Sequence, residues 1–255
     1  MSLVATPAIV LSAIRYGETS KIVRLATRDH GVQSAIAKGA LRPKSRFGAA
    51  LQLLCSGQAQ LLLSERRDLH TLTAFDVLHL PLTLSHDLER YTAASALAEL
   101  VSRVAPTEPR PATFDLLREA LVLLEQAPAE AVEVVGLRLL WRMVQELGFG
   151  PSLDHCVRCG EPIPAEGGLL FLPEEGGALG AECAGVSGPA RLGQADRRDL
   201  VALVLPGHDL PVLDAPHAAA HRRLLSRFIH HHVAEGQALP ALDFWTARSW
   251  EEKGR

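Results

Sequence analysis

The chain of 255 residues is poor in cysteine and in aromatic residues, and each shortage excludes a class of protein. Its four cysteines are too few for a disulfide framework in a chain of this length. Aromatic residues make up 5% and hydrophobic residues 47%, so the core has to be built mainly from Leu, Val and Ala. No run approaches the ~20 apolar residues of a membrane helix, and Met1–Pro7 resembles no signal peptide. We therefore expect a cytoplasmic protein without membrane contact.

The chain also lacks the sequence motifs of common enzyme classes. It has no Gly-x-Ser-x-Gly elbow, no Walker phosphate loop and no Gly-x-Gly-x-x-Gly dinucleotide fingerprint. No pair of carboxylates stands out from the acidic residues expected on helix surfaces. These absences predict a protein that is not an enzyme.

Positive charge is concentrated in residues 15–46 of a chain whose formal net charge is −3. This segment has two acidic residues, and its eight basic residues are Arg15, Lys21, Arg24, Arg28, Lys38, Arg42, Lys44 and Arg46. Its net charge is +6, so the remaining residues carry −9. Such a distribution indicates a surface that attracts a polyanion while the rest of the chain repels it.

The densest part of this segment is the run Lys38-Gly-Ala-Leu-Arg-Pro-Lys-Ser-Arg-Phe-Gly48. Four cations in nine residues cannot pack into a core, and the Gly and Pro residues between them indicate a loop between strands. A basic loop beside a β-barrel is a common means of holding single-stranded nucleic acid. We predict nucleic-acid contacts at Lys21, Arg24, Lys38, Arg42, Lys44 and Arg46. A solvated loop without a ligand is the alternative.

Few aromatic rings lie near these cations. Only Tyr16 and Phe47 are close in the sequence, and Phe47 is also a candidate for the core. Since stacking on rings adds ~1–3 kcal/mol per base, affinity should here be mainly electrostatic, sensitive to salt and weakly specific for sequence.

The periodicity of apolar residues predicts an α+β multidomain chain. Between residues 6 and 80, the expected strands are Ala8–Ile14, Lys21–Thr27, Val32–Ala37, Ala50–Ser56, Ala59–Ser64 and Leu69–Val77. Short strands with frequent turns indicate a small sandwich or barrel, and their number fits a five-stranded OB-type β-barrel at residues 1–80. Helical spacing follows at 83–105, 113–126, 129–147, 194–204 and 215–234, with Gly148 as a C-terminal cap. We predict an all-helical domain at 81–148 and 191–255, with a small zinc-knuckle-like insertion at 149–190.

Three of the four cysteines lie in the insertion. Cys156-Val-Arg-Cys159-Gly160 places two thiols on one tight turn, and Cys183 follows. A structural zinc ion normally takes four ligands, but a second C-x-x-C would need a cysteine where Gly180 stands. The other candidates for the fourth ligand are His155, Glu174, Glu175 and Glu182. A metal-free knuckle, a redox pair and a catalytic zinc are alternatives, although no general base is placed for catalysis.

The remaining candidates favour ordinary structural interpretations. His217 and His221 have the i, i+4 spacing of metal ligands, whereas His230–His232 point in different directions on a helix. With Arg222, Arg223 and Arg227, these histidines indicate a solvated or partner-facing basic helix, which could add phosphate contacts. Cys55 lies in an apolar segment and is expected in the core.

Two segments resemble the RecO family of bacterial DNA-repair proteins. They are Tyr16-Gly-Glu-Thr-Ser-Lys-Ile-Val23 and Ala37-Lys-Gly-Ala-Leu-Arg-Pro-Lys-Ser-Arg-Phe-Gly48, with Gly31 and a strand between them. The order of barrel, helices, C-x-x-C-G insertion and helices is also similar, so the resemblance covers essentially the whole chain.

The resemblance implies a recombination mediator without catalytic activity. Such a protein binds single- and double-stranded DNA, anneals complementary strands and, with RecR, loads RecA onto DNA coated by single-strand-binding protein (SSB). It also implies contact with the acidic SSB tail through the helical domain, location with the bacterial nucleoid, and a four-cysteine zinc site. Cys156, Cys159 and Cys183 match that site, and Gly180 departs from it.

Two other classes of function are compatible with the residues. In one, the chain is a protein-interaction adaptor whose basic loop docks an acidic segment of a partner. In the other, it is a zinc-dependent hydrolase built on the insertion.

Overall fold

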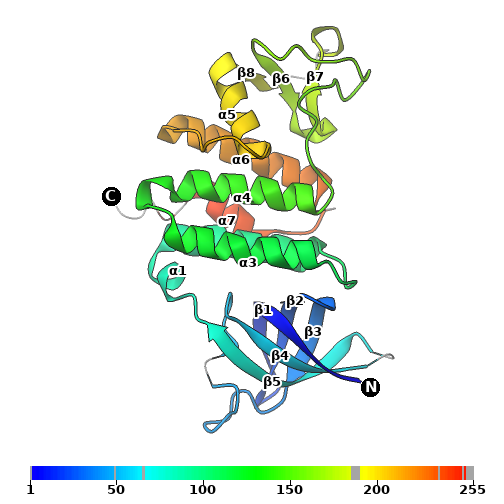
Figure 1. Cartoon of the computed structure of the whole chain (residues 1–255), viewed down its shortest axis with the longest axis vertical. Coiled ribbons are helices and arrows are strands. Elements are labelled where there is room, and N and C mark those ends of the chain that lie inside the picture. The colour runs from blue at the N-terminus through cyan, green and yellow to red at the C-terminus, as the bar shows by residue number, and fades with distance from the viewer. Residues whose placement is uncertain are drawn as a thin grey trace. The chain divides into compact units, whose positions relative to one another are not determined.

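The computed structural model describes residues 2–48, 50–64, 67–184, 190–234, 236–248 and 250. It divides the chain into two compact units, Met1–Gln126 and Ala127–Arg255. Figure 1 shows the elements of both units along the chain. The three-domain division at residues 80, 148 and 190 stays a prediction. Among the described residues, no helix combines the length and the apolar character that crossing a membrane requires.

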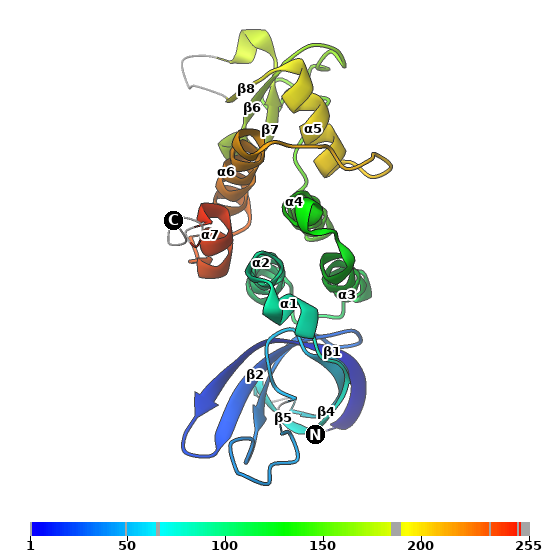
Figure 2. The same cartoon turned by 90° about the vertical axis from the view of Figure 1, so that its left-hand side faces the viewer.

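Five strands of the first unit close into a barrel (Figures 1 and 2). They are β1 (Ser2–Tyr16), β2 (Ser20–Thr27), β3 (Gly31–Ala37), β4 (Ser56–Leu63) and β5 (Leu69–His79). Their order is β1-β2-β3-β5-β4, with β3 and β5 parallel and the other neighbours antiparallel. This confirms the predicted OB-type barrel.

Strand β1 closes the barrel because it pairs on both sides. Its residues from Ser2 to Ile9 pair with β4, and those from Ala8 to Tyr16 pair with β2. The register with β2 shifts between Val10 and Ser12, and such a bulge bends a strand and increases its twist. One long, bent strand therefore joins the two ends of the sheet.

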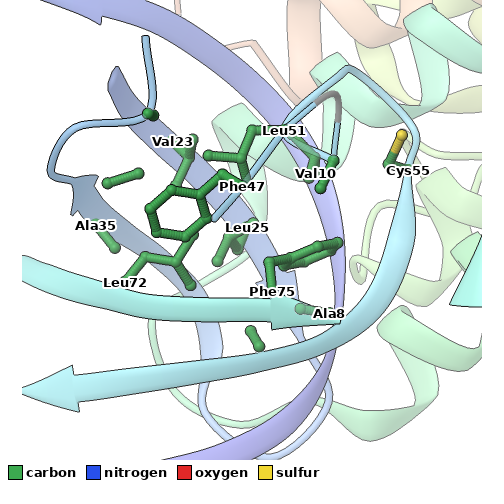
Figure 3. Close-up of a cluster of buried hydrophobic side chains, with 14 of the residues drawn as sticks. Ala8, Val10, Val23, Leu25, Ala35, Phe47, Leu51, Cys55, Leu72 and Phe75 are labelled. Atoms are coloured by element: carbon green, nitrogen blue, oxygen red, sulfur yellow. The ribbon is translucent and has the colours of Figure 1, made fainter. Parts of the chain in front are cut away.

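The loop between β3 and β4 contributes to the barrel core. Its buried apolar residues are Ala40, Phe47, Ala50, Leu51 and Cys55, which join inward-facing residues of the strands. Figure 3 shows the Phe47 ring beside Val23, Leu25 and Leu72. Cys55 is in the core as expected, but the strand predicted at 50–56 is wrong. Turns replace it, with Leu54 in the left-handed region at φ +68°.

Three helices complete the first unit: α1 (Leu82–His86), α2 (Leu88–Val104) and α3 (Pro111–Gln126). One helix was expected over residues 83–105, but Asp87 divides it. The Asp87 carboxylate accepts a hydrogen bond from the backbone N–H of Arg90 at 3.1 Å and so caps α2. Helix α2 packs against β1, β2 and α3.

The second unit combines helices with a small sheet. Its helices are α4 (Val132–Glu146), α5 (Gln194–Val204), α6 (Ala215–His232) and α7 (Pro240–Ala247), and its 3-10 turns are η1 (Ala129–Ala131), η2 (Pro173–Glu175) and η3 (Ala181–Cys183). Strands β6 (Leu169–Leu172), β7 (Gly177–Leu179) and β8 (Ala190–Leu192) form an antiparallel sheet in the order β7-β6-β8. Gly148 follows α4 at φ +96°, as predicted for a cap. The sequence analysis missed this sheet and α7.

A buried ion cluster links three helical segments of the second unit. The Glu133 carboxylate on α4 pairs with Arg222 on α6 and, at 3.1 Å, with Arg248 just after α7. Arg222 also donates to the carbonyl of Thr246 at 3.3 Å. The predicted solvated role of Arg222 is therefore wrong, because its guanidinium neutralises a carboxylate inside the unit.

We predict that Phe47→Ala lowers the free energy of unfolding of the first unit by about 3–5 kcal/mol, because Phe47 is 2% exposed. Phe47→Leu, which keeps most of the side-chain volume, should cost less than about 1.5 kcal/mol. Urea unfolding of the two variants measures the difference. Equal losses would contradict the proposed anchoring of the loop by this ring.

Candidate nucleic-acid interface and metal centre

Successive hydrogen-bonded turns give the basic loop its form. The N–H groups of Arg42, Ser45 and Gly48 donate to the carbonyls three residues earlier at 3.1, 2.9 and 3.2 Å. The loop is also joined to the hairpin between β1 and β2, where the Leu41 N–H donates to the Thr19 carbonyl at 2.8 Å. Gly39, at φ +73°, lets the chain leave β3 and enter the first turn.

Four predicted contact residues lie together on this loop, and we call them the loop cations: Lys38, Arg42, Lys44 and Arg46. All four are exposed, and within the described part of the chain none forms an ion pair with a carboxylate. The Arg46 guanidinium lies 5.3 Å from the centre of the Phe47 ring. The loop therefore buries Ala40 and Phe47 and leaves its charges in water.

Lys21 supports this loop from the barrel. It belongs to the face of β2 that carries the buried residues Val23 and Leu25, because side chains alternate along a strand. Its Nζ donates a hydrogen bond to the carbonyl of Leu51 at 3.2 Å. The ammonium group thus holds the chain just after the loop cations.

Arg24 is on the opposite face of β2 and connects the barrel to a helix. Its Nε donates to the Ser102 carbonyl at 2.9 Å, and another guanidinium nitrogen lies 3.3 Å from Ser34 Oγ. Ser102 is in the last turn of α2, where carbonyl groups carry partial negative charge. Burial and then the nearby Arg103 lower the pKa of Arg24 from its ordinary value. Lys21 and Arg24 therefore lie on opposite faces of β2, and their contact with nucleic acid stays a prediction.

Arg28 likewise makes an internal pair in the first unit. Its guanidinium donates two hydrogen bonds to the carboxylate of Asp115 on α3, at 3.1 and 3.3 Å, and these raise the pKa of Arg28. Asp115 is 87 residues away in the sequence, so no local pattern could have revealed this neutralisation. Arg15 is exposed and donates to the nearby Gly17 carbonyl at 3.2 Å.

The three cysteines of the insertion come together in the second unit. The sulfur atoms of Cys156, Cys159 and Cys183 all lie within 4.8 Å of one another. Gly160, at φ +75°, forms the turn, and its N–H donates to the Cys156 carbonyl at 2.9 Å. Thiolates at such separations fit three corners of a tetrahedral zinc site.

The surroundings favour different protonation states for these thiols. Cys156 is buried, and the backbone N–H groups of Gly180 and Cys159 lower its pKa to about 6. Hydrogen bonds with Cys159 and Cys156 raise the pKa of Cys183 to about 11. One thiolate is therefore stabilised by the backbone even before any cation neutralises the cluster.

None of the alternative fourth ligands joins the three sulfur atoms. Glu175 accepts from Arg158 at 2.6 Å, Glu174 accepts from Arg227 at 2.9 Å, and His155 pairs with Asp154 at 3.1 Å. Glu182 is exposed and lies outside the cluster. Gly180 does face it, since a Cβ atom built there would lie 3.8 Å from the Cys156 sulfur.

Most histidines of helix α6 contact other residues of the second unit. His217 Nδ1 lies 2.5 Å from the Asp214 carboxylate, which raises the pKa of His217, whereas burial lowers the pKa of His221. His232 contacts the Pro173 carbonyl at 2.7 Å, and His230 lies 2.6 Å from Asp243. Among the described residues, His217 and His221 belong to no group of three or more possible metal ligands.

We predict that Arg24→Ala lowers the free energy of unfolding by about 1–2 kcal/mol, because it removes charged hydrogen bonds at a half-buried position. Arg28→Ala, which breaks an exposed pair, should cost less. Urea unfolding measures both losses. Neither variant should change the salt dependence of DNA binding, and a large change with Arg24→Ala would instead place this side chain on the DNA.

Family models match both parts of the chain. "Recombination protein O N terminal" matches residues 1–81, and "Recombination protein O C terminal" matches residues 85–239. The second match alone covers more than half of the chain.

Relatives described as DNA repair protein RecO are similar over most of their length. The protein of Anaeromyxobacter dehalogenans is 33% identical over 96% of each chain. The protein of Rubrobacter xylanophilus is 34% identical over 72% of this chain and 72% of its own length. That of Heliobacterium modesticaldum is 36% identical over 72% of this chain and 66% of its own length. This chain therefore belongs to the RecO family, whose members are DNA-repair proteins of recombination.

Proposed function

We propose that this protein is a non-catalytic recombination mediator that binds DNA through the loop cations. The observation that carries the proposal is the exposure of four cations on one ordered loop, with no carboxylate paired to them in the described part of the chain. Each can neutralise a phosphate group and release the counterion condensed on it.

Annealing of complementary strands follows from the same charges. Two DNA strands repel one another through their phosphates, and a cationic layer that neutralises both reduces this repulsion without reading the bases. Phe47 is buried in the barrel core, so its ring cannot stack on a base. This arrangement supports binding to single- and double-stranded DNA with little preference for sequence.

Membership in the RecO family supports the rest of the proposal. We propose that the protein cooperates with RecR to load RecA onto single-stranded DNA coated by SSB, and that it contacts the acidic SSB tail through its helices. These partners fit a molecule that performs no chemistry itself and acts by bringing DNA and proteins together.

We also propose that Cys156, Cys159 and Cys183 hold a structural zinc ion. Their sulfur atoms are close enough to share one cation, and the pair Arg158–Glu175 beside them joins the C-x-x-C turn to η2. When bound, zinc would link this turn to the segment after β7 and so stabilise the fold of the small sheet.

We predict that replacing the four loop cations by Glu greatly weakens DNA binding. At ~50–200 mM salt, the slope of log affinity against log salt for single strands should decrease in magnitude by about 3, because each phosphate contact contributes about 0.7. Fluorescence anisotropy with a labelled oligonucleotide measures affinity and slope.

The matched control reverses four other exposed arginines and changes the net charge equally: Arg103, Arg110, Arg191 and Arg198. It should retain most of the wild-type slope. Wild-type affinity of the loop variant, or equal losses in both variants, would exclude the loop as the principal contact surface.

A further inference from the structure

We propose that the zinc ion of this protein has an open fourth coordination position, beside Gly180, that takes a small exchangeable donor from solution. This inference rests on the proposed zinc site and concerns only how that site is completed. The donor would be a neutral, monodentate ligand such as water or imidazole.

The first reason is that three of the four candidate donors already have partners, and the fourth, Glu182, lies outside the cluster. The carboxylates of Glu174 and Glu175 are held by arginines, and the His155 ring pairs with Asp154. Of the His, Cys, Asp and Glu residues that the structure describes, only the three cysteines form the cluster. The segment 185–189, which follows η3 in the sequence, is Gly-Val-Ser-Gly-Pro and contains none of these four residue types.

The second reason is the space beside Gly180. A Cβ atom at this position would meet only Cβ and Sγ of Cys156 within 4 Å, both at 3.8 Å. These are ordinary van der Waals distances, so the position faces the Cys156 sulfur, and apart from the two residues adjoining Gly180 no other part of the described chain fills it. The backbone of Gly180 is extended, at φ −66° and ψ 152°, and any L-residue can adopt it.

The third reason is the charge of the zinc site and the coordination number of zinc. Three thiolates around Zn²⁺ give a net charge of −1, and each thiol transfers its proton to solvent when the metal binds. Tetrahedral zinc takes four ligands, so a solvent molecule would complete the shell where the protein supplies three. One imidazole would replace one water, and no bond of the protein would form or break.

Cobalt substitution tests the inference on the full chain. Co²⁺ is added to the metal-free wild type, to Gly180→Cys and to Cys156→Ser, and the thiolate-to-cobalt and d–d absorption bands are followed. Imidazole is then titrated into each. We expect a saturable shift of the d–d bands in the wild type, no shift in Gly180→Cys because a fourth thiolate occupies the position, and weak thiolate-to-cobalt absorption in Cys156→Ser.

The outcomes separate this inference from the zinc proposal. If the wild type shows Co²⁺ bands that imidazole does not shift, the protein itself supplies the fourth ligand. This result would overturn the open position but not the zinc site. If Gly180→Cys shows thiolate-to-cobalt absorption and the wild type does not, three thiols are not enough to hold the metal. This result would overturn both the open position and the zinc site of the wild type. Absence of such bands from wild type and Gly180→Cys alike would overturn the zinc site itself.

Discussion

The burial of apolar side chains from the loop between β3 and β4 determines where the charges of this protein lie. Phe47 and Leu51 pack among residues of the barrel strands, and each contributes about 1.5–3 kcal/mol by leaving water. The loop cations, which all precede Phe47 in the sequence, cannot enter the core with it, because an unpaired charge there would cost far more. The same segment therefore completes the core and presents positive charge to solvent. Its turns satisfy backbone groups along the way, so hydrogen bonds within the chain give the described part of the loop its form.

The cations of residues 15–46 fall into two groups that their sequence does not distinguish. Arg24 and Arg28 attach the barrel to α2 and α3 through Ser102 and Asp115, and Lys21 holds the loop through Leu51. These three cations stabilise the first unit, whereas the loop cations remain available to phosphates. The net charge of +6 over residues 15–46 thus includes charges that already have partners inside the first unit.

Local patterns predicted most elements, and long-range contacts account for what they missed. Segments rich in apolar and β-branched residues, bounded by turn residues, were sufficient to predict β2 and β3. The run of four cations that precedes Phe47 was predicted as an exposed loop, with Phe47 as a candidate for the core. Residues 50–56 were predicted as a strand because they are rich in apolar residues. These apolar side chains do join the barrel core, but they do so from turns. The partners of Arg24 and Arg28 lie 78 and 87 residues away, beyond any local pattern. In the insertion, cysteine spacing indicated the three-thiol cluster and the departure at Gly180, but not the sheet that supports them.

Amide hydrogen exchange of the full chain, with and without an oligothymidylate, tests most directly whether the loop is where DNA binds. The account predicts slower exchange at residues 38–48 when the oligonucleotide is present, and recovery of the free rates as salt is raised. Protection concentrated on α6, with unchanged exchange in residues 38–48, would contradict it.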